Sequence, residues 1–245
     1  MEKKNNKPIG ELIYGIHPLV EILKAKRRKV ISIYTTRPEP KAWHTSIAPL
    51  LVAKKIPIQY VDRNVLDRMA GSIDHQGIVA WVQPFAFRSK PFDPQKHPFL
   101  LMLDGIQDNR NLGAILRSAY CTGVSGIILN KRFSAPINSA TLKASAGLAE
   151  HLEIYIAQTP ITAAQELSKL GYSFYLAAFD GTDATTVHYT QPMVLVIGSE
   201  GEGISQGMSK FGTTITIPQR TPDISYNASV AAGILMFIAS QHIKK

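Results

Sequence analysis

The sequence predicts an α/β protein whose larger part is built on a mostly parallel β-sheet. From Phe99 onward, short apolar runs typical of buried strands alternate with segments that have the apolar spacing of helices. Such alternation is typical of parallel sheets with helices on both faces. A smaller α/β segment precedes it, and prolines cluster between residues 84 and 98, which disfavours both helix and central strand there. We therefore expect two domains, residues 9–84 and 98–245, joined by a linker at residues 85–97.

The smaller domain is expected to alternate helices and strands. Leu19, Ile22 and Leu23 have the spacing of one helix face, and Asp62 is well placed to cap a later helix. In chain order, the expected elements are a helix at 17–24, a strand at 30–34, a helix at 42–54, a strand at 56–61, a helix at 62–69 and a strand at 77–82.

The larger domain repeats the alternation. Strands are expected at 99–103, 126–129, 153–156, 173–178, 193–197 and 214–217. Helices are expected at 112–121, 139–149, 161–170, 205–211 and 228–241. The last helix is apolar almost all round, which favours burial in a core or against a partner, and Asn227 is well placed as its N-cap.

The charge and the composition of the chain favour some classes of partner and exclude some kinds of site. The formal net charge of +9 favours a polyanionic partner, most often nucleic acid, although a merely basic protein stays open. The one cysteine, Cys121, excludes a disulfide framework or a cysteine-rich metal site, and its helical setting predicts a small core residue. The histidines have no ligand-spaced partners, so we expect no metal.

Three polar loops follow strands of the larger domain, at residues 104–111, 198–203 and 218–227. Ligands of open α/β sheets bind outside the carboxyl ends of the strands, so these loops are the expected site. The spacing of the glycine-rich loop, GxxGxG, differs from the dinucleotide fingerprint, and no Lys-Ser/Thr pair follows as in a P-loop.

Taken singly, the polar residues of these loops have plain structural explanations. Asn111 is placed to cap the helix at 112–121, and Ser225 and Asn227 to cap the last helix. Arg117 lies either on a solvated helix face or holds a phosphate as a bidentate cation. Three glycine- or asparagine-rich loops at three strand ends are more than turn formation requires, which favours a functional site.

The three loops resemble the ordered motifs of the SpoU/TrmH family of RNA 2′-O-ribose methyltransferases. The motifs here are DGIQDNRNLGAILR (104–117), IGSEGEGIS (197–205) and IPQRTPDISYNASV (217–230). In the smaller domain, YGIHPLVEIL and DHQGIVAWV resemble the family's substrate-binding domain. The two-domain arrangement is most similar to members that methylate a guanosine of 23S rRNA near the peptidyl-transferase centre.

The resemblance implies a fold, a cofactor and partners. The implied fold is a SPOUT catalytic domain, an α/β domain with a parallel sheet and a deep trefoil knot, preceded by a small L30e-like α/β domain. The implied cofactor is S-adenosylmethionine, and the implied partners are RNA, most closely rRNA, and a second copy of the chain. The homodimer would form through the catalytic domain and use the terminal helix.

The resemblance also assigns residues. The implied catalytic residues are Asn111, Arg117, Glu200, Ser225 and Asn227. The implied cofactor contacts are Gly198, Gly201, Ile217 and Tyr226, largely through backbone, with Ile217 and Tyr226 beside the adenine. Motif one has Asn109 where proline is usual, and motif three reads Ser-Tyr-Asn where Ser-Leu-Asn is usual. Neither departure removes an implied catalytic residue.

Arg27, Arg28 and Lys29 belong to a basic run in the smaller domain and are the expected RNA contacts. A solvated helix end is the plainer explanation of the same run. No apolar run approaches the roughly 20 residues of a membrane span, and the N-terminus lacks the apolar core of a signal peptide. We therefore expect no membrane partner and a cytoplasmic location.

Alternative functions remain open at this point. One is a tRNA 2′-O-methyltransferase of the same family, with the same chemistry on another substrate. Another is a catalytically silent RNA-binding protein on the same fold, against which the intact set of implied catalytic residues argues. A nicotinamide-dependent dehydrogenase is disfavoured by the missing dinucleotide fingerprint.

Overall fold

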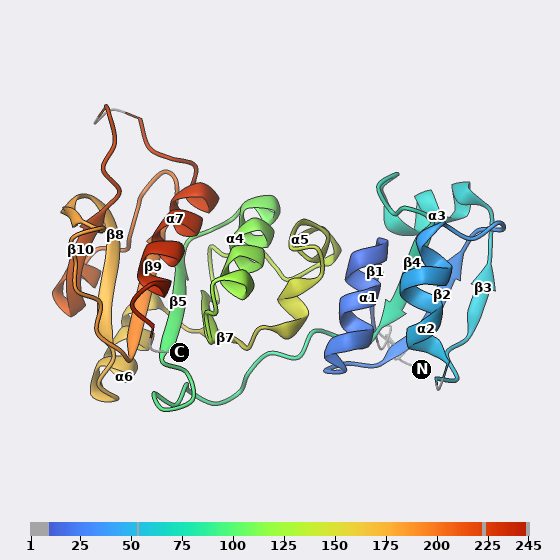
Figure 1. Cartoon of the computed structure of the whole chain (residues 1–245), viewed down its shortest axis with the longest axis horizontal. Coiled ribbons are helices and arrows are strands. Elements are labelled where there is room, and N and C mark those ends of the chain that lie inside the picture. Colours follow the sequence, from blue (N-terminus) through green and yellow to red (C-terminus); the bar gives the residue numbers. More distant parts are fainter. Residues whose placement is uncertain (1–9, 53, 222–223, 244–245) are drawn as a thin grey trace, which may run out of the picture. The chain divides into compact units, whose positions relative to one another are not determined.

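The computed structural model describes residues 10–52, 54–221 and 224–243, which form two compact units (Figure 1). Unit 1 comprises the described residues up to Ala86 together with Ile137–His151. Unit 2 comprises Phe87–Pro136 and the described residues from Leu152 onward. The chain therefore passes between the units three times, whereas the sequence predicted a single linker at residues 85–97. Residue 9, where the first expected domain begins, lies outside the described residues.

Unit 1 is an α/β unit with a four-stranded sheet in the order β1-β4-β2-β3. β4 pairs antiparallel with both β1 and β2, and β3 pairs parallel with β2. The elements before the first crossing are β1 (Glu11–Tyr14), α1 (Ile16–Ala25), β2 (Val30–Thr35), the π-helix η1 (Trp43–Ile47), α2 (Ala48–Leu51), β3 (Ile58–Tyr60), α3 (Arg63–Ala70) and β4 (Ile78–Val82). α1 buries Leu19, Ile22 and Leu23, the face that the sequence spacing predicted.

The segment Ile137–His151 completes unit 1. It contains α5 (Ser139–Ala144) and the 3-10 helix η2 (Leu148–His151); α5 packs against β1 and α1, and η2 against α1. The guanidinium of Arg28 binds the Glu150 carboxylate with two nitrogens, at 3.1 and 2.5 Å, and both side chains are 2% exposed. Burial raises the pKa of Glu150, and the charge of Arg28 opposes this shift. An ion pair so deeply buried requires this segment to be in place.

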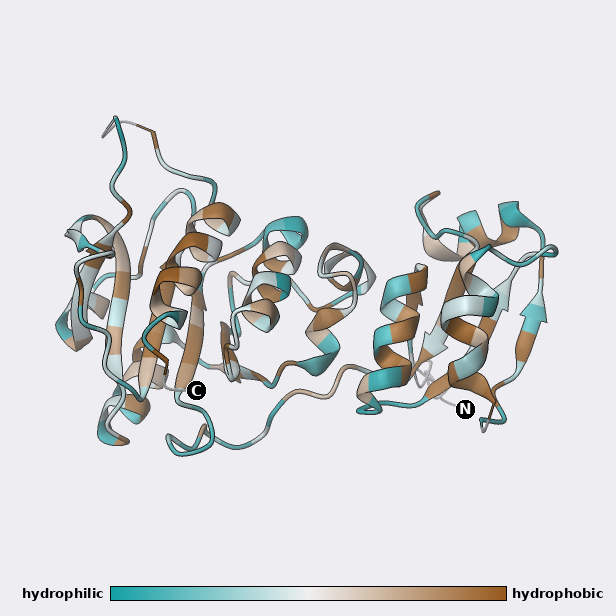
Figure 2. Cartoon of the chain, in the orientation of Figure 1, coloured by the Kyte–Doolittle hydropathy of each residue, from teal (hydrophilic) through white to brown (hydrophobic). Residues whose placement is uncertain are grey.

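Unit 2 has a six-stranded, all-parallel sheet in the order β10-β8-β9-β5-β6-β7. The parallel sheet expected from the sequence is therefore confirmed. Its strands are β5 (Phe99–Asp104), β6 (Gly126–Asn130), β7 (Ile154–Ala157), β8 (Ser173–Asp183), β9 (Met193–Gly198) and β10 (Gly212–Thr216). Every residue of β5 is buried, and Figure 2 shows hydrophobic colouring along β5 and β9, as expected of strands covered on both faces.

The helices of unit 2 are α4 (Asn109–Cys121), α6 (Pro160–Lys169), the 3-10 helix η3 (Met208–Phe211) and α7 (Ala228–Ser240). α7 packs beside α4 and touches β9, and Figure 1 shows the two helices side by side. α7 buries Leu235 and Met236, while Val230 is 48% and Phe237 61% exposed. One stripe of this apolar helix therefore faces the unit's core and another faces solvent.

β8 contains an irregularity beside the site. Its partner register with β10 jumps from Leu176–Thr214 to Thr182–Ile215, so residues 177–181 leave the ladder. A Cβ added at Gly181 would lie 2.5 Å from the backbone of Ile215, so only glycine fits where the strand rejoins. The close approach of Gly181 to Ile215 thereby fixes the end of the bulged segment beside β10.

Several expectations were wrong in detail. The sequence reading missed β1, and the helix expected at 42–54 is divided into η1 and α2. The helix expected at 205–211 is only the 3-10 turn η3. Cys121, expected in the core, is exposed because it is the last residue of α4. The trefoil knot stays a prediction.

Candidate functional site

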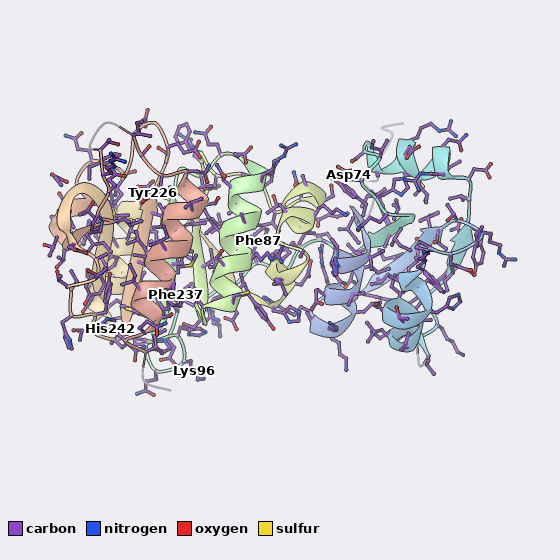
Figure 3. The ribbon with its side chains drawn as sticks, turned by 45° about the horizontal axis from the view of Figure 1, so that its top comes forward. Asp74, Phe87, Lys96, Tyr226, Phe237 and His242 are labelled. Atoms are coloured by element: carbon purple, nitrogen blue, oxygen red, sulfur yellow. The ribbon has the colours of Figure 1, made fainter. Side chains whose placement is uncertain are left out.

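The three polar loops follow β5, β9 and β10, at the carboxyl edge of the unit 2 sheet. β5 and β9 are neighbours, so the first two loops emerge side by side. β10 lies at one edge of the sheet, and Asn227, the last residue of the third loop, is the N-cap of α7. Because α7 packs on α4, its first turn arrives beside the start of α4, and Figure 3 labels Tyr226 there, just before α7.

Three of the five predicted catalytic residues meet in one hydrogen-bonded cluster, the Asn-Glu-Asn cluster of Asn111, Glu200 and Asn227. Asn111 Nδ2 donates to Glu200 Oε1 at 2.5 Å. Asn227 Nδ2 donates to the same Oε1 and to Asn111 Oδ1, both at 3.2 Å. Two amides thus hold one carboxylate oxygen, which fixes the orientation of Glu200.

The caps of the two helices explain this geometry. Asn227 caps α7 as predicted, since its Oδ1 accepts from the amide of Ser229 at 2.9 Å, and this leaves Nδ2 free for the cluster. Asn111 was expected to cap α4, and this is wrong. α4 begins at Asn109, and Asp108 is its N-cap, accepting from the Asn111 amide at 2.8 Å. The Asn111 side chain is therefore available to bind Glu200.

The glycine-rich loop is a closed turn. Ser199 and Gly203 exchange backbone hydrogen bonds at 2.9 and 3.0 Å, which fold residues 199–203 back on themselves. A Cβ at Gly198 would lie 2.1 Å from the carbonyl carbon of Gly203, so the closed turn requires glycine at that position. A Cβ at Gly201 would meet no protein atom within 4 Å. Space is therefore open beside the Gly201 backbone.

A cavity of about 690 Å³, the first cavity, lies on one side of this turn. All four predicted cofactor contacts line it: Gly198, Gly201, Ile217 and Tyr226. The bulge of β8 (Ala177, Ala178, Phe179 and Asp180), Glu200 and Ser225 also line it. The walls combine glycine backbone, apolar side chains and a few polar groups. Such a lining suits a small organic ligand with one flat apolar part.

A second cavity of about 810 Å³ lies on the other side. It is lined by residues of the β5–α4 loop, the segment after β6 and the start of α6, including Asp104, Asn111, Asn130, Arg132, Phe133 and Thr159. Residues 199–203 line both cavities, so Glu200 faces the first and the second. Two ligand-sized spaces therefore meet at one carboxylate.

Arg117 does not join the Asn-Glu-Asn cluster. Asn111 and Arg117 are six positions apart on α4, which separates them by about 9 Å along the axis and turns them about 120° apart. Arg117 is exposed and lines neither cavity. Within the described part of this chain it makes no hydrogen bond or ion pair. Ser225 is exposed and lines the first cavity.

The predicted RNA contact at Arg28 needs correction. Arg28 is 7% exposed, and its nitrogens are bound by Glu150, by Glu11 Oε2 at 2.8 Å and by the carbonyl of Gln83 at 2.9 Å. A guanidinium bound in this way has no face to offer a phosphate. Arg27 and Lys29 are both exposed and remain predicted contacts.

Sequence reasoning missed a buried polar group under the second cavity. Asp104, 5% exposed, accepts from the Ser205 amide at 2.7 Å, from Ser205 Oγ at 3.0 Å and from Asn130 Nδ2 at 2.8 Å. Charged and amide side chains ending buried strands, as Asp104 ends β5 and Asn130 ends β6, were the available signal. This group ties the glycine loop to the first two strands.

The described residues lack a metal-binding cluster and a membrane-spanning helix. They include no group of three or more His, Cys, Asp or Glu side chains placed to hold a metal ion. They also include no helix with the length and apolar character needed to span a membrane.

Comparison with known families gives two matches. The model described as the SpoU rRNA methylase family matches residues 98–237. The model described as RNA 2′-O ribose methyltransferase substrate binding matches residues 12–88.

Individual relatives match along nearly the whole chain. A putative TrmH family tRNA/rRNA methyltransferase, YacO of Bacillus subtilis, is 30% identical over 237 residues, covering 93% of this chain and 94% of the relative. The 23S rRNA (guanosine-2′-O-)-methyltransferase RlmB of Photorhabdus laumondii is 32% identical over 240 residues, covering 94% and 98%.

Solved structures share the fold. An RNA 2′-O ribose methyltransferase superposes with a TM-score of 0.83 at 18% identity, over 96% of this chain and 89% of the other. An AdoMet-bound rRNA methyltransferase from Sinorhizobium meliloti superposes with a TM-score of 0.79 at 23% identity, over 97% and 89%.

Proposed function

Because this chain belongs to the SpoU rRNA methylase family, we propose that it transfers the methyl group of S-adenosylmethionine to the 2′-hydroxyl of a guanosine in 23S rRNA. The family match and the substrate-binding match together span both units. The relative from Photorhabdus is named for this reaction. The observation that carries the proposal is the Asn-Glu-Asn cluster, whose Glu200 borders two cavities of ligand size.

The first cavity fits the cofactor. Gly198 and Gly201 both line this cavity, and the open space beside the Gly201 backbone is space that a side chain there would occupy. Ile217 and Tyr226 line the same space and are the proposed neighbours of the adenine. The Sinorhizobium enzyme, whose fold this chain shares, was solved with AdoMet bound.

The chain's own residues must orient the hydroxyl and assist the departure of its proton. When bound, S-adenosylmethionine supplies an electrophilic methyl group on a positively charged sulfur. A ribose hydroxyl ionises only far above neutral pH, so positioning and a nearby acceptor are both needed. Asn111 and Asn227 occupy Oε1 of Glu200, and Oε2 makes no hydrogen bond with the described residues. Glu200 Oε2 is the proposed acceptor for the 2′-hydroxyl.

Arg117 is proposed to hold the phosphate beside the target ribose. A guanidinium stays protonated in proteins, so a positioning role is favoured over that of a base. Arg117 is exposed on α4 and lines neither cavity, so the RNA or a second copy of the chain must bring its guanidinium and the target together. Ser225 is proposed to complete the hydrogen-bonding groups around the first cavity.

A homodimer through unit 2 is part of the proposal. Val230 and Phe237 on α7 are both apolar and about half exposed or more, and Figure 3 labels Phe237 near the end of that helix. Burial of such a stripe against a second copy would remove apolar surface from water. Light scattering of the purified protein would measure the mass in solution.

The RNA is proposed to contact unit 1 through Arg27 and Lys29 and unit 2 through the site. Neutralised phosphates release counterions, so binding should weaken as salt rises. A substrate of this kind is found in the cytoplasm, which is the proposed location.

The decisive experiment is methyl transfer from labelled S-adenosylmethionine to unmodified 23S rRNA, with bulk tRNA alongside and mapping of the modified ribose. One guanosine 2′-O-methyl group in 23S rRNA is expected. Label in tRNA alone would overturn the substrate and keep the reaction. Absence of cofactor binding, measured by calorimetry, would overturn the enzyme and favour an RNA-binding protein.

A further inference from the structure

The second cavity contains a buried hydrogen-bond acceptor that no described residue satisfies. Asn130, at the end of β6, is 7% exposed and lines this cavity. Its Nδ2 donates to Asp104 Oδ1 at 2.8 Å, while its Oδ1 is buried without a partner among the described residues. The opposite amide orientation would put an oxygen against the Asp104 carboxylate, so the orientation follows from the chemistry. A buried acceptor left unpaired is unfavourable, which points to a ligand that donates to it.

The charges around this cavity select the kind of ligand. Four carboxylates line it, those of Asp104, Asp108, Glu200 and Glu202, and Arg132 is the one basic residue among the described residues of its wall. Carboxylates and an amide oxygen accept hydrogen bonds and repel anions. The cavity interior therefore suits a neutral group rich in donors, with a phosphate only at Arg132.

Phe133 supplies an aromatic surface at the same cavity. Its side chain is 73% exposed, and its φ of 61° is unusual for a bulky residue. Exposed aromatic rings stack on nucleobases that leave the RNA stack, and the enclosing pocket then reads the base edge. Phe133 and Asn130 belong to one short segment, so both groups are presented to one base-sized ligand.

We propose that the second cavity binds the base of the target guanosine, with Phe133 stacked on the ring and Asn130 Oδ1 accepting from the 2-amino group of the base. Guanine carries two adjacent donors, N1–H and the 2-amino group, whereas adenine and cytosine pair one amino group with an acceptor. This inference rests on the proposed function in two respects, that the first cavity holds the methyl donor and that the methylated residue is a guanosine. The ribose of a base seated here would then lie near Glu200, which borders both cavities.

The direct test measures binding of nucleotides to the full-length protein by calorimetry. The probes are guanosine 5′-monophosphate and inosine 5′-monophosphate, which lacks the 2-amino group, with adenosine 5′-monophosphate as a third. Guanosine 5′-monophosphate should bind about tenfold more tightly than either, the worth of one well-placed hydrogen bond. Asn130→Ala should bring the three affinities together. Equal affinities in the wild-type protein would overturn the proposal.

Two control variants separate recognition from a loss of structure. Ser205→Ala also removes a donor to Asp104 but keeps Asn130 Oδ1, so the preference for guanosine should survive. Phe133→Ala should weaken the binding of all three nucleotides by about tenfold or more. Phe87→Ala, at an exposed aromatic residue outside both cavities, should leave their affinities unchanged. If Asn130→Ala loses the circular-dichroism signal of the folded protein, the proposal is decided by comparing the nucleotide affinities of Phe133→Ala and Phe87→Ala. Equal losses of affinity in these two variants would refute the proposal.

A second readout distinguishes this inference from the proposed function. Once the methylated position is mapped, a synthetic rRNA fragment carrying inosine there should be methylated about tenfold more slowly than guanosine, and Asn130→Ala should abolish the difference. Methylation of another base, or of inosine as fast as guanosine, would refute the base pocket and leave the methyltransferase standing. Selective binding of guanosine 5′-monophosphate without any methyl transfer would leave the pocket and refute the reaction.

Discussion

Asn111 Nδ2 donates to Glu200 Oε1 across 89 residues of sequence, and this 2.5 Å bond joins the first turn of α4 to the loop after β9. Neither side chain is needed to cap a helix, because Asp108 caps α4. The bond therefore serves the site, where it fixes one carboxylate oxygen and leaves the other for a ligand.

Replacing Glu200 with alanine should lower the rate of methyl transfer at saturating substrates by about 100-fold, the lower end of the range for a proton acceptor. Stability should change little, because Glu200 is exposed. Single-turnover kinetics and thermal unfolding measure the two effects. Glu202→Ala is the matched control, since Glu202 lines the same two cavities without joining the Asn-Glu-Asn cluster. Equal losses in both variants would contradict a special role for Glu200.

Arg117→Ala should reduce methyl transfer to RNA by about tenfold or more while cofactor affinity stays unchanged, because one charged contact to a phosphate is lost. Calorimetry with S-adenosylmethionine and transfer assays on RNA separate the effects. Arg110→Ala, another exposed arginine of α4, is the comparison. Near-normal transfer by Arg117→Ala would exclude the assignment.

Gly198→Ala should lower the stability of the protein, whereas Gly201→Ala should lower its affinity for the cofactor. An added Cβ at Gly198 meets the Gly203 backbone, so that variant should lose the closed turn and part of its stability. At Gly201 the added Cβ meets no protein atom, so stability should persist while cofactor affinity falls by about tenfold, the typical cost of overpacking. Thermal unfolding with and without S-adenosylmethionine measures both quantities. Unchanged affinity in Gly201→Ala would argue against a cofactor in the first cavity.

Replacing Arg28 should affect the stability of the fold, and replacing its neighbour Lys29 should affect RNA binding. Arg28→Ala leaves the Glu150 carboxylate buried without its partner, which should cost about 3–5 kcal/mol in the free energy of unfolding. Lys29→Ala should leave stability unchanged and reduce the salt dependence of RNA binding by about one phosphate contact. Urea unfolding and filter binding at several salt concentrations test the pair. A Lys29 variant with an unchanged salt slope would remove that residue from the RNA interface.

Glu21 should make unit 1 sensitive to acid. Burial acts to raise its pKa, but hydrogen bonds from Lys24 and His151, both at 2.8 Å, outweigh it and leave the pKa below the ordinary value of 4.5. A lowered pKa stabilises the fold above pH 4.5, and this stabilisation is lost as the pH falls through the folded-state value. The difference in unfolding free energy between wild type and Glu21→Gln should therefore shrink below pH 4.5. A difference that is constant with pH would contradict the pairing.

The sequence predicted the strands of unit 2 well, because buried parallel strands such as β5 and β9 are continuous apolar runs with clear ends. Short edge elements were less predictable: β1 has only four residues and is half-buried at its start. The exposed thiol of Cys121 was missed because a helical pattern does not show which end of the helix emerges from the core.

The site was predictable as three loops at one sheet edge, and as motifs, but not as contacts. Which amide binds which carboxylate depends on the start of α4, and a shift of that start from Leu112 to Asn109 changes Asn111 from a cap into a ligand of Glu200. The burial of Arg28 was not predictable either, because its partner Glu150 lies 122 residues away. Spacing within a basic run carries no information about such a partner.

The return of residues 137–151 to unit 1 has a consequence for synthesis on the ribosome. Unit 1 cannot be complete when its N-terminal segment emerges, because Glu150 and η2 follow the whole of unit 2's first stretch of chain, Phe87–Pro136. Until then Arg28 has no buried carboxylate to bind, and the first segment of the nascent chain stays incompletely folded. The two units of this enzyme must therefore fold in an interleaved order, and a chain shortened to the substrate-binding match at residues 12–88 would lack a piece of its own core.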